Sequence, residues 1–139
     1  MGYFITSYEI DVKISVSKAD AALIEMKRIN GPEFDQYKCG GDGQRVKWYS
    51  WMPESFDEFK TIDEFLECVG FEGTKRDSDF VTLGHYDKKT GSEDVFMHFL
   101  APFIEAGSFI NWRGEDGGMW RWEFDGTTVE RKTAQTLWV

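Results

Sequence analysis

The sequence has few of the residues that support disulfide, metal or nucleophilic chemistry. Its 139 residues include two cysteines, two histidines and three prolines. Cys39 and Cys68 fit no spaced metal-binding or redox motif, which predicts reduced thiols in a cytoplasm rather than a disulfide framework. His85 and His98 lack the spacing of a zinc site. We therefore expect no bound metal and no cofactor.

Basic charge and long apolar runs are scarce as well. Lysine and arginine number 16 against 25 acidic residues, which gives a net charge of −9 and a pI near 4.7. This balance argues against direct nucleic-acid binding, because affinity for phosphates comes from clustered Lys and Arg. No apolar run approaches the roughly 18 residues of a membrane span, and no secretory leader opens the chain. We predict a cytoplasmic protein, in the host cytoplasm if it is phage-encoded, with no membrane contact.

Apolar and aromatic residues are plentiful by contrast. They make up 41% and 17% of the chain, which is enough for a hydrophobic core without disulfides or metal ions. A chain of 139 residues without a linker or repeat predicts one domain, residues 1–139. The oligomeric state is left open, with a homodimer as one option.

The apolar periodicity of the first half predicts strands alternating with helices. Residues 9–16 alternate as in a half-buried strand, and helical spacing follows from Ser17 to the Gly31-Pro32 pair. A surface loop is expected over residues 33–44. The further expected elements are a strand at 45–51, a helix opened by a capping box at 61–64 and ended by Gly70, and a strand at 80–86.

The second half predicts one more helix and then a run of strands. Ser92 opens a helix that Pro102 is expected to kink or break. The expected strands lie at 108–114, 119–125 and 127–132, joined by a Glu-Asp-Gly-Gly turn and the Asp125-Gly126 pair, and residues 135–139 can form a last strand. The fold class is therefore α+β, with a mostly antiparallel sheet, a C-terminal β-meander and two to three helices packed on one face.

The hairpin at residues 109–124 is one candidate site. Its strands place aromatic side chains on one face and a mixed set on the other, and two arginines flank the glycine-rich turn. Core packing of the aromatics beside exposed arginines explains this pattern without a ligand. The alternative is a nucleotide-type ligand held by an aromatic wall and guanidinium groups. The residues of this alternative site are Trp112, Arg113, Glu115, Asp116, Trp120 and Arg121.

Residues 54–72 hold the densest charge of the sequence. Seven acidic residues stand against the single base Lys60, a local balance of −6. A solvated face that keeps an aromatic-rich protein soluble is the simpler interpretation. The alternative is charge mimicry, in which carboxylates on a capped helix occupy a basic groove that otherwise holds nucleic acid. The candidate residues are Asp57, Glu58, Asp63, Glu64 and Glu67, with Trp48, Trp51 and Phe56 as the nearest aromatic anchors or as core residues.

Three stretches of the sequence carry a resemblance to known proteins. The opening MGYFITSYEIDV, the Trp48-Tyr49 pair and the stretch WRGEDGGMWRWEFDG resemble a loose set of small, mostly uncharacterised proteins of phages, prophages and plasmids. Such proteins begin with Met-Gly-Tyr and end in a Gly-Glu-(Asp/Glu)-Gly turn before an aromatic strand. The similarity is confined to the two ends and one middle point of the chain. It implies an accessory role in a mobile element and supplies no catalytic residue.

The sequence contains no recognisable catalytic motif. No Gly-x-Ser-x-Gly, Walker or deaminase pattern occurs in it. A carboxylate metal site from Glu115, Asp116 and a histidine, as in a small metal-dependent hydrolase, is the least favoured hypothesis. We predict a non-enzymatic accessory protein that binds and inhibits a host-defence or nucleic-acid-binding protein with a basic surface. A toxin-immunity protein or a nucleotide-binding sponge would also fit this sequence.

Overall fold

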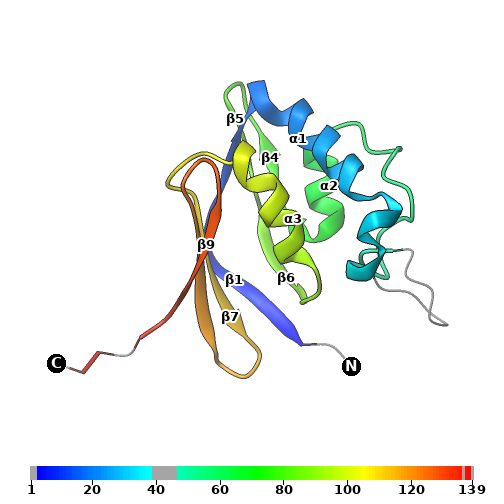
Figure 1. Cartoon of the computed structure of the whole chain (residues 1–139). Coiled ribbons are helices and arrows are strands. Elements are labelled where there is room, and N and C mark those ends of the chain that lie inside the picture. The colour runs from blue at the N-terminus through cyan, green and yellow to red at the C-terminus, as the bar shows by residue number, and fades with distance from the viewer. Residues whose placement is uncertain (1–2, 39–46, 136, 139) are drawn as a thin grey trace.

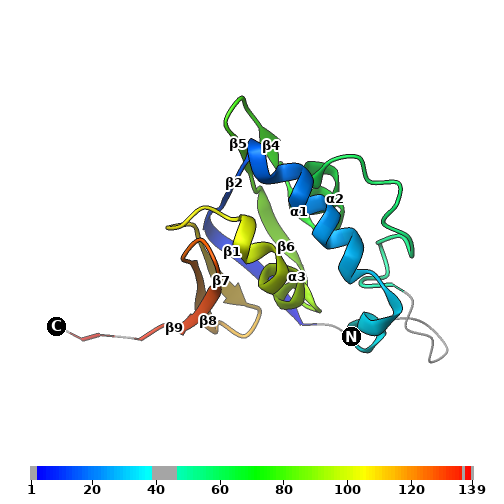
Figure 2. The same cartoon turned by 45° about the horizontal axis from the view of Figure 1, so that its top comes forward.

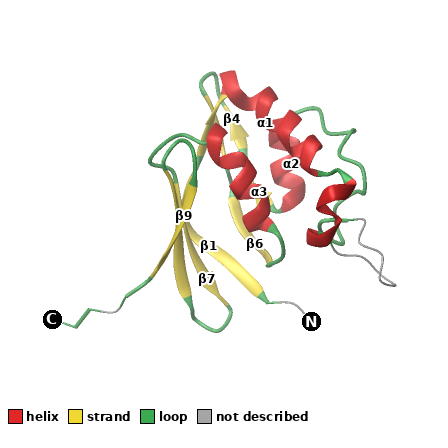
Figure 3. Ribbon diagram, viewed as in Figure 1, coloured by secondary structure: helices red, strands yellow, loops and turns green. Residues whose placement is uncertain are grey.

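The computed structural model describes residues 3–38, 47–135 and 137–138. Figures 1 and 3 show a strongly twisted sheet with a group of helices packed beside one of its faces. The fold class is α+β with a mostly antiparallel sheet, as the sequence predicts.

The large sheet has six strands in the order β3-β6-β1-β7-β8-β9, and all its pairings are antiparallel. Because β7, β8 and β9 are consecutive and adjacent, the predicted C-terminal meander is confirmed. The turns between them use Gly117 and Gly126 at φ of 89° and 95°, in the left-handed region that favours glycine. The strands of this sheet are β1 (Phe4–Asp11), β3 (Phe71–Glu72), β6 (His85–Lys89), β7 (Phe109–Gly114), β8 (Met119–Phe124) and β9 (Val129–Thr133).

A second, three-stranded sheet lies at one end of the large one (Figure 2). It consists of β2 (Lys13–Ser15), β4 (Lys75–Arg76) and β5 (Phe80–Thr82) in the order β2-β5-β4. The prediction of one strand over residues 80–86 is therefore wrong, because β5 ends at Thr82 and β6 begins at His85 in the other sheet. Gly84 lies between β5 and β6, where the chain passes from one sheet to the other. It packs so closely on β3 that a Cβ atom would overlap the carbonyl oxygen of Glu72.

The first strand begins five residues earlier than the alternation at 9–16 predicts and ends at Asp11, and β2 at Lys13–Ser15 covers part of the remainder. β1 begins at Phe4, and a register shift between Ser7 and Glu9 changes which side chains face the core. Ile5 and Ser7 are buried before the shift, whereas the buried positions after it are Val12 and Ile14. Such a shift is a β-bulge, and a buried serine hides it from a hydrophobic pattern. Val16 does not belong to the strand but begins the first helix.

Three α-helices and two short 3-10 helices complete the described fold. α1 runs beside both α2 and α3 (Figure 2). The predicted capping of α2 is confirmed, since the Thr61 hydroxyl accepts a hydrogen bond from the Glu64 N–H at 3.2 Å. The predicted break at Pro102 is also confirmed, because α3 ends at Leu100 and a 3-10 helix follows. The helices are α1 (Val16–Ile29), η1 (Pro32–Tyr37), α2 (Ile62–Val69), α3 (Glu93–Leu100) and η3 (Ala101–Phe103).

The core between helices and sheet is rich in aromatic rings. The Trp48 ring lies 4.6 Å from that of Phe96, which contacts Phe65 edge-on at 5.4 Å. Trp48 and Tyr49 are consecutive and both buried, at 2% and 4% exposure. A strand cannot turn two successive side chains to one core, whereas the bends and turns observed at residues 48–51, after a single bridge residue at Lys47, can. The predicted strand is therefore wrong over these residues, and positions 45–46 lie outside the described residues.

Two other predictions concern segments that the structure describes only in part. The expected loop at 33–44 is a 3-10 helix as far as Tyr37, and its remainder from residue 39 lies outside the described residues. Of the expected last strand at 135–139, Gln135, Leu137 and Trp138 are described and none is in a strand. Leu137 and Trp138 are 85% and 90% exposed, so no described strand covers them.

Candidate protein-binding site

The candidate site is built on α2 and the segment before it. The helix buries its apolar stripe of Ile62, Phe65, Leu66 and Val69, each at 1% exposure or less. This packing and the Thr61 cap fix the orientation of the helix, so the opposite side of α2 faces solvent. We call the five carboxylates of α2 and the segment before it the acidic face, which comprises Asp57, Glu58, Asp63, Glu64 and Glu67.

One residue of the acidic face is neutralised by a base from another part of the chain. Asp63 forms a bidentate pair with the Arg76 guanidinium of β4, with a shortest N–O distance of 2.8 Å. Hydrogen bonds from Arg76 lower the pKa of the Asp63 carboxyl. Arg76 lies outside residues 54–72, so the local balance of −6 includes the Asp63 charge without the arginine that neutralises it in the fold.

The other four carboxylates keep their charge. Asp57, Glu58, Glu64 and Glu67 are exposed, and none forms an ion pair with any residue that the structure describes. Glu67 accepts a 3.0 Å hydrogen bond from the Gly73 N–H, which orders its side chain. These four carboxylates therefore carry a charge of about −4 on α2 and the segment before it.

The three aromatic residues before α2 have different surroundings. Trp48 and Phe56 are buried at 2% and 1% exposure, so they pack in the core. Trp51 is 38% exposed, and its indole N–H donates to the carbonyl of Val69, the last residue of α2, at 3.2 Å. The Trp51 ring also stacks on Tyr49, with centroids 4.5 Å apart. Among these three, only Trp51 presents an ordered ring surface to solvent, and it does so at the end of α2.

The alternative site on the hairpin is divided between the two faces of the sheet. Trp112 pairs with Trp120 across β7 and β8, and this side of the hairpin faces the core, where Trp112 is fully buried. The two arginines lie on the other side, where Arg113 covers Tyr8 at 5.1 Å and Arg121 covers Phe109 at 4.6 Å. The structure thus separates Trp112 from Arg113 and Arg121, whereas Trp120 and Arg121 both line a pocket that also includes Lys132 and Thr133 of β9.

The acids of the hairpin turn have local structural partners. Glu115 accepts a 3.1 Å hydrogen bond from the Phe4 N–H, and Asp116 accepts one from the Tyr3 hydroxyl. The Tyr3 hydrogen bond is the largest cause that lowers the pKa of Asp116. Both acids therefore attach the turn to the start of β1.

The two histidines lie on different elements, His85 in β6 and His98 in α3. The alternation of an unbroken strand would turn His85 the same way as Val81 and Leu83, but it is exposed whereas they are buried, because the strand is broken at Gly84. Its Nδ1 lies 3.2 Å from the Ser7 Oγ, a contact that no sequence motif indicates. The Ser7 Oγ also accepts from the Tyr86 N–H at 2.9 Å. Burial at 2% exposure and this bond give the Ser7 hydroxyl a structural role.

The described residues include no cluster of metal-binding side chains. Across residues 3–38, 47–135 and 137–138, no group of three or more His, Cys, Asp or Glu side chains is placed to hold a metal ion. Cys68 is a free, half-buried thiol whose pKa is raised by burial and by the nearby Glu58, and Cys39 lies outside the described residues.

Comparisons with known proteins do not assign this surface. No protein-family model, curated protein or solved structure matches the chain. None of the helices in the described residues is long and apolar enough to cross a membrane.

Proposed function

We propose that this protein is a non-enzymatic accessory protein that binds a basic surface on another protein through its acidic face. The observation that carries the proposal is the group of four exposed, unpaired carboxylates at Asp57, Glu58, Glu64 and Glu67, held on a capped and packed helix and the segment before it. A host-defence or nucleic-acid-binding protein is the partner class that offers a matching basic surface. The resemblance to proteins of phages and plasmids supports the same context.

Charged residues and apolar anchors act on different steps of such an association. The net charge of −9 attracts a basic partner over a range of about 8 Å at physiological salt, which raises the association rate. Rim charges contribute little to the lifetime of a complex, which depends on buried apolar anchors. Trp51 supplies an exposed ring at the end of α2 whose position is already fixed by Val69 and Tyr49. The proposal therefore combines steering by the acidic face with anchoring by the Trp51 ring, over which the Lys88 ammonium lies at 5.3 Å.

The proposal does not include catalysis. Among the described residues, Ser7 is the hydroxyl that contacts a histidine, His85, and the Ser7 hydroxyl is buried. A buried hydroxyl that accepts a backbone hydrogen bond cannot reach a substrate in this conformation. These observations support binding rather than turnover.

Partner capture with matched charge variants tests the proposal. The first variant converts the four free carboxylates to amides as Asp57→Asn, Glu58→Gln, Glu64→Gln and Glu67→Gln. The control variant removes the same charge elsewhere through Asp11→Asn, Glu33→Gln, Asp79→Asn and Glu130→Gln, all at exposed positions. Each protein is immobilised, exposed to host lysate at low and moderate salt, and its captured proteins are identified by mass spectrometry.

The expected result is a basic protein captured by the wild type and the control variant but lost from the first variant. Purified wild-type protein should then block nucleic-acid binding by that partner, with an association rate that falls as salt rises. A captured toxin without nucleic-acid binding would favour the immunity hypothesis. Identical captured sets for all three proteins would contradict the proposal and leave the acidic face as a solubility device.

A further inference from the structure

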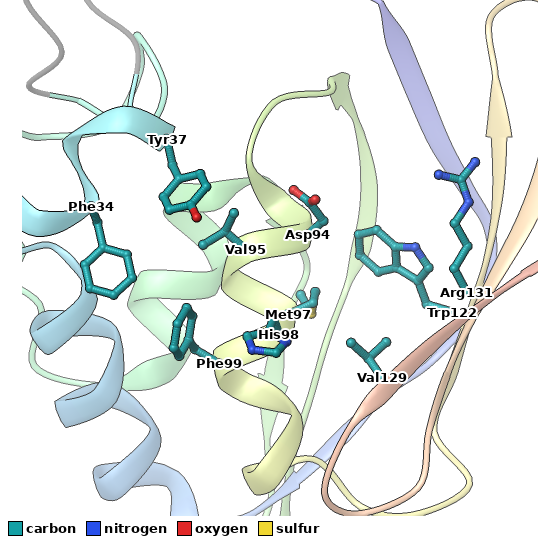
Figure 4. A pocket seen from close by; sticks show the side chains of 10 residues that line it. All are labelled: Phe34, Tyr37, Asp94, Val95, Met97, His98, Phe99, Trp122, Val129 and Arg131. Carbon is teal, nitrogen blue, oxygen red and sulfur yellow. The ribbon is translucent and has the colours of Figure 1, made fainter.

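A cleft separate from the acidic face runs along α3 next to strands β8 and β9. Its volume is about 560 Å³, within the range of small-molecule sites, about 300–1,000 Å³. Figure 4 shows aromatic side chains on both sides of α3, with Phe34 and Phe99 on one side and Trp122 on the other. Met97 and Val129 lie below the Trp122 indole in the same view. The walls are therefore those of a site for an apolar or aromatic group.

Two opposite charges lie across this cleft. Figure 4 places the Asp94 carboxylate of α3 and the Arg131 guanidinium of β9 on opposite sides of the Trp122 indole. The strand register pairs Arg131 with Trp122, which fixes both side chains on the helix-facing side of the sheet. The guanidinium lies 5.2 Å from the centre of the Trp120 ring, which limits its orientation.

Arg131 lies over the Trp120 ring and Asp94 lies in the first turn of α3, but neither side chain has an ion-pair partner among the described residues. Asp94 and Arg131 make no side-chain hydrogen bond or ion pair with each other or with any other residue that the structure describes. On the opposite face of the meander, by contrast, Glu123 is matched by Arg121 and Lys132. The cleft thus offers one free acceptor and one free donor set around an aromatic wall.

This combination restricts the chemistry of a ligand. A phosphate or other multiply charged anion meets the Asp94 carboxylate and the net charge of −9, so it is disfavoured. A purely cationic or purely anionic molecule leaves one of the two charged side chains without a partner. A zwitterion with an aromatic ring satisfies both charges and stacks on the wall at once.

We propose that this cleft binds an α-amino acid with an aromatic side chain. Its ammonium group faces Asp94, its carboxylate faces Arg131, and its ring lies against Trp122 in the apolar part of the cleft. The site is independent of the acidic face, because α3 and β9 carry none of the five carboxylates that define that face.

Titration with a matched set of ligands tests this assignment. L-phenylalanine carries both charges, 3-phenylpropanoate lacks the ammonium group and 2-phenylethylamine lacks the carboxylate. Binding is measured by calorimetry and by the fluorescence of the protein's tryptophans excited at a wavelength where these ligands do not absorb. L-phenylalanine is expected to bind at least about tenfold more tightly than either analogue, since each analogue loses one charge-assisted hydrogen-bonding group.

Charge variants assign each ligand group to its residue. Arg131→Gln should weaken L-phenylalanine and 3-phenylpropanoate but not 2-phenylethylamine, whereas Asp94→Asn should weaken L-phenylalanine and 2-phenylethylamine only. Glu130→Gln and Lys132→Gln, which lie on the other face of β9, are the controls and should leave all three affinities unchanged. Absence of saturable L-phenylalanine binding, or equal affinity for the three ligands, would overturn the proposal. All four residues are exposed, so we expect each variant to fold, and circular dichroism checks this.

Discussion

The phenol of Tyr49 donates a 2.6 Å hydrogen bond to the Oε2 of Glu93, 44 residues further along the chain. Glu93 is 3% exposed at the first residue of α3, and its carboxylate also accepts hydrogen bonds from the Gly91 N–H and the Thr90 hydroxyl. Burial of a carboxyl group is tolerated when it is hydrogen-bonded, as this one is by three donors. The contact joins the irregular segment around Trp48 to the start of α3.

Removal of the Tyr49 hydroxyl should therefore destabilise the protein. We expect Tyr49→Phe to lower the free energy of unfolding by about 1.5–3 kcal/mol, the range for a hydrogen bond to a charged group. Urea denaturation measures the effect. Tyr37→Phe is the matched control, because the Tyr37 side chain is 41% exposed, and it should change stability by less than about 0.5 kcal/mol. Equal effects of the two substitutions would show that the Glu93 contact is not stabilising.

The same burial predicts a loss of stability at alkaline pH. Burial is the largest cause that raises the pKa of Tyr49 and of Tyr86 in the folded protein above the ordinary value. A folded-state pKa above the unfolded one means that stability is fully present below about pH 10 and is lost as pH rises further. Ultraviolet absorbance of tyrosinate and far-UV circular dichroism should therefore show these two tyrosines ionising only as the chain unfolds. Ionisation of Tyr49 and Tyr86 in a still-folded protein would contradict this expectation.

The Asp63–Arg76 pair predicts a loss of stability at acidic pH. Arg76 lowers the folded-state pKa of Asp63, so the pair stabilises the protein above the unfolded pKa of about 4 and loses its effect as pH falls below it. Asp63→Asn should cost about 0.5–1 kcal/mol at neutral pH, as for a partly exposed ion pair, and this cost should shrink as pH falls through the lowered folded-state pKa of Asp63. Glu64→Gln, which removes an unpaired carboxylate of the same helix, is the control. A cost for Asp63→Asn that does not depend on pH would exclude the ion pair as its source.

Substitutions at Gly84 and Gly73 test the close packing of the β5–β6 connection on β3. A Cβ at Gly84 would overlap the backbone of Glu72, whereas the space around Gly73 is open within 4 Å. Gly84→Ala should therefore destabilise the protein by about 3 kcal/mol or more, the upper end for overpacking. Gly73→Ala should cost only the left-handed backbone strain, about 1–2 kcal/mol, since Gly73 has a φ of 84°. Thermal unfolding compares the two, and a reversed order would contradict the close packing of β3 on Gly84.

Local sequence signals determined the helices and the meander. The Thr61 cap, the stop at Gly70, the break at Pro102 and the glycine turns of the last three strands each depend on residues close together in the chain. The apolar stripe of α2 likewise fixed which side of that helix faces solvent, so the acidic face could be located from sequence alone. Short-range backbone preferences decide features of this kind.

Contacts between distant segments decided the rest. The break at Gly84 follows from the approach of β3, the β-bulge after Ser7 from pairing with β7, and the neutralisation of Asp63 from Arg76 on another strand. The cleft along α3 combines Asp94 with Arg131, which only the packing of the helix beside the meander brings to one place. A hydrophobic or charge pattern reports neighbours in sequence, whereas these features depend on neighbours in space, and only the tertiary structure contains them.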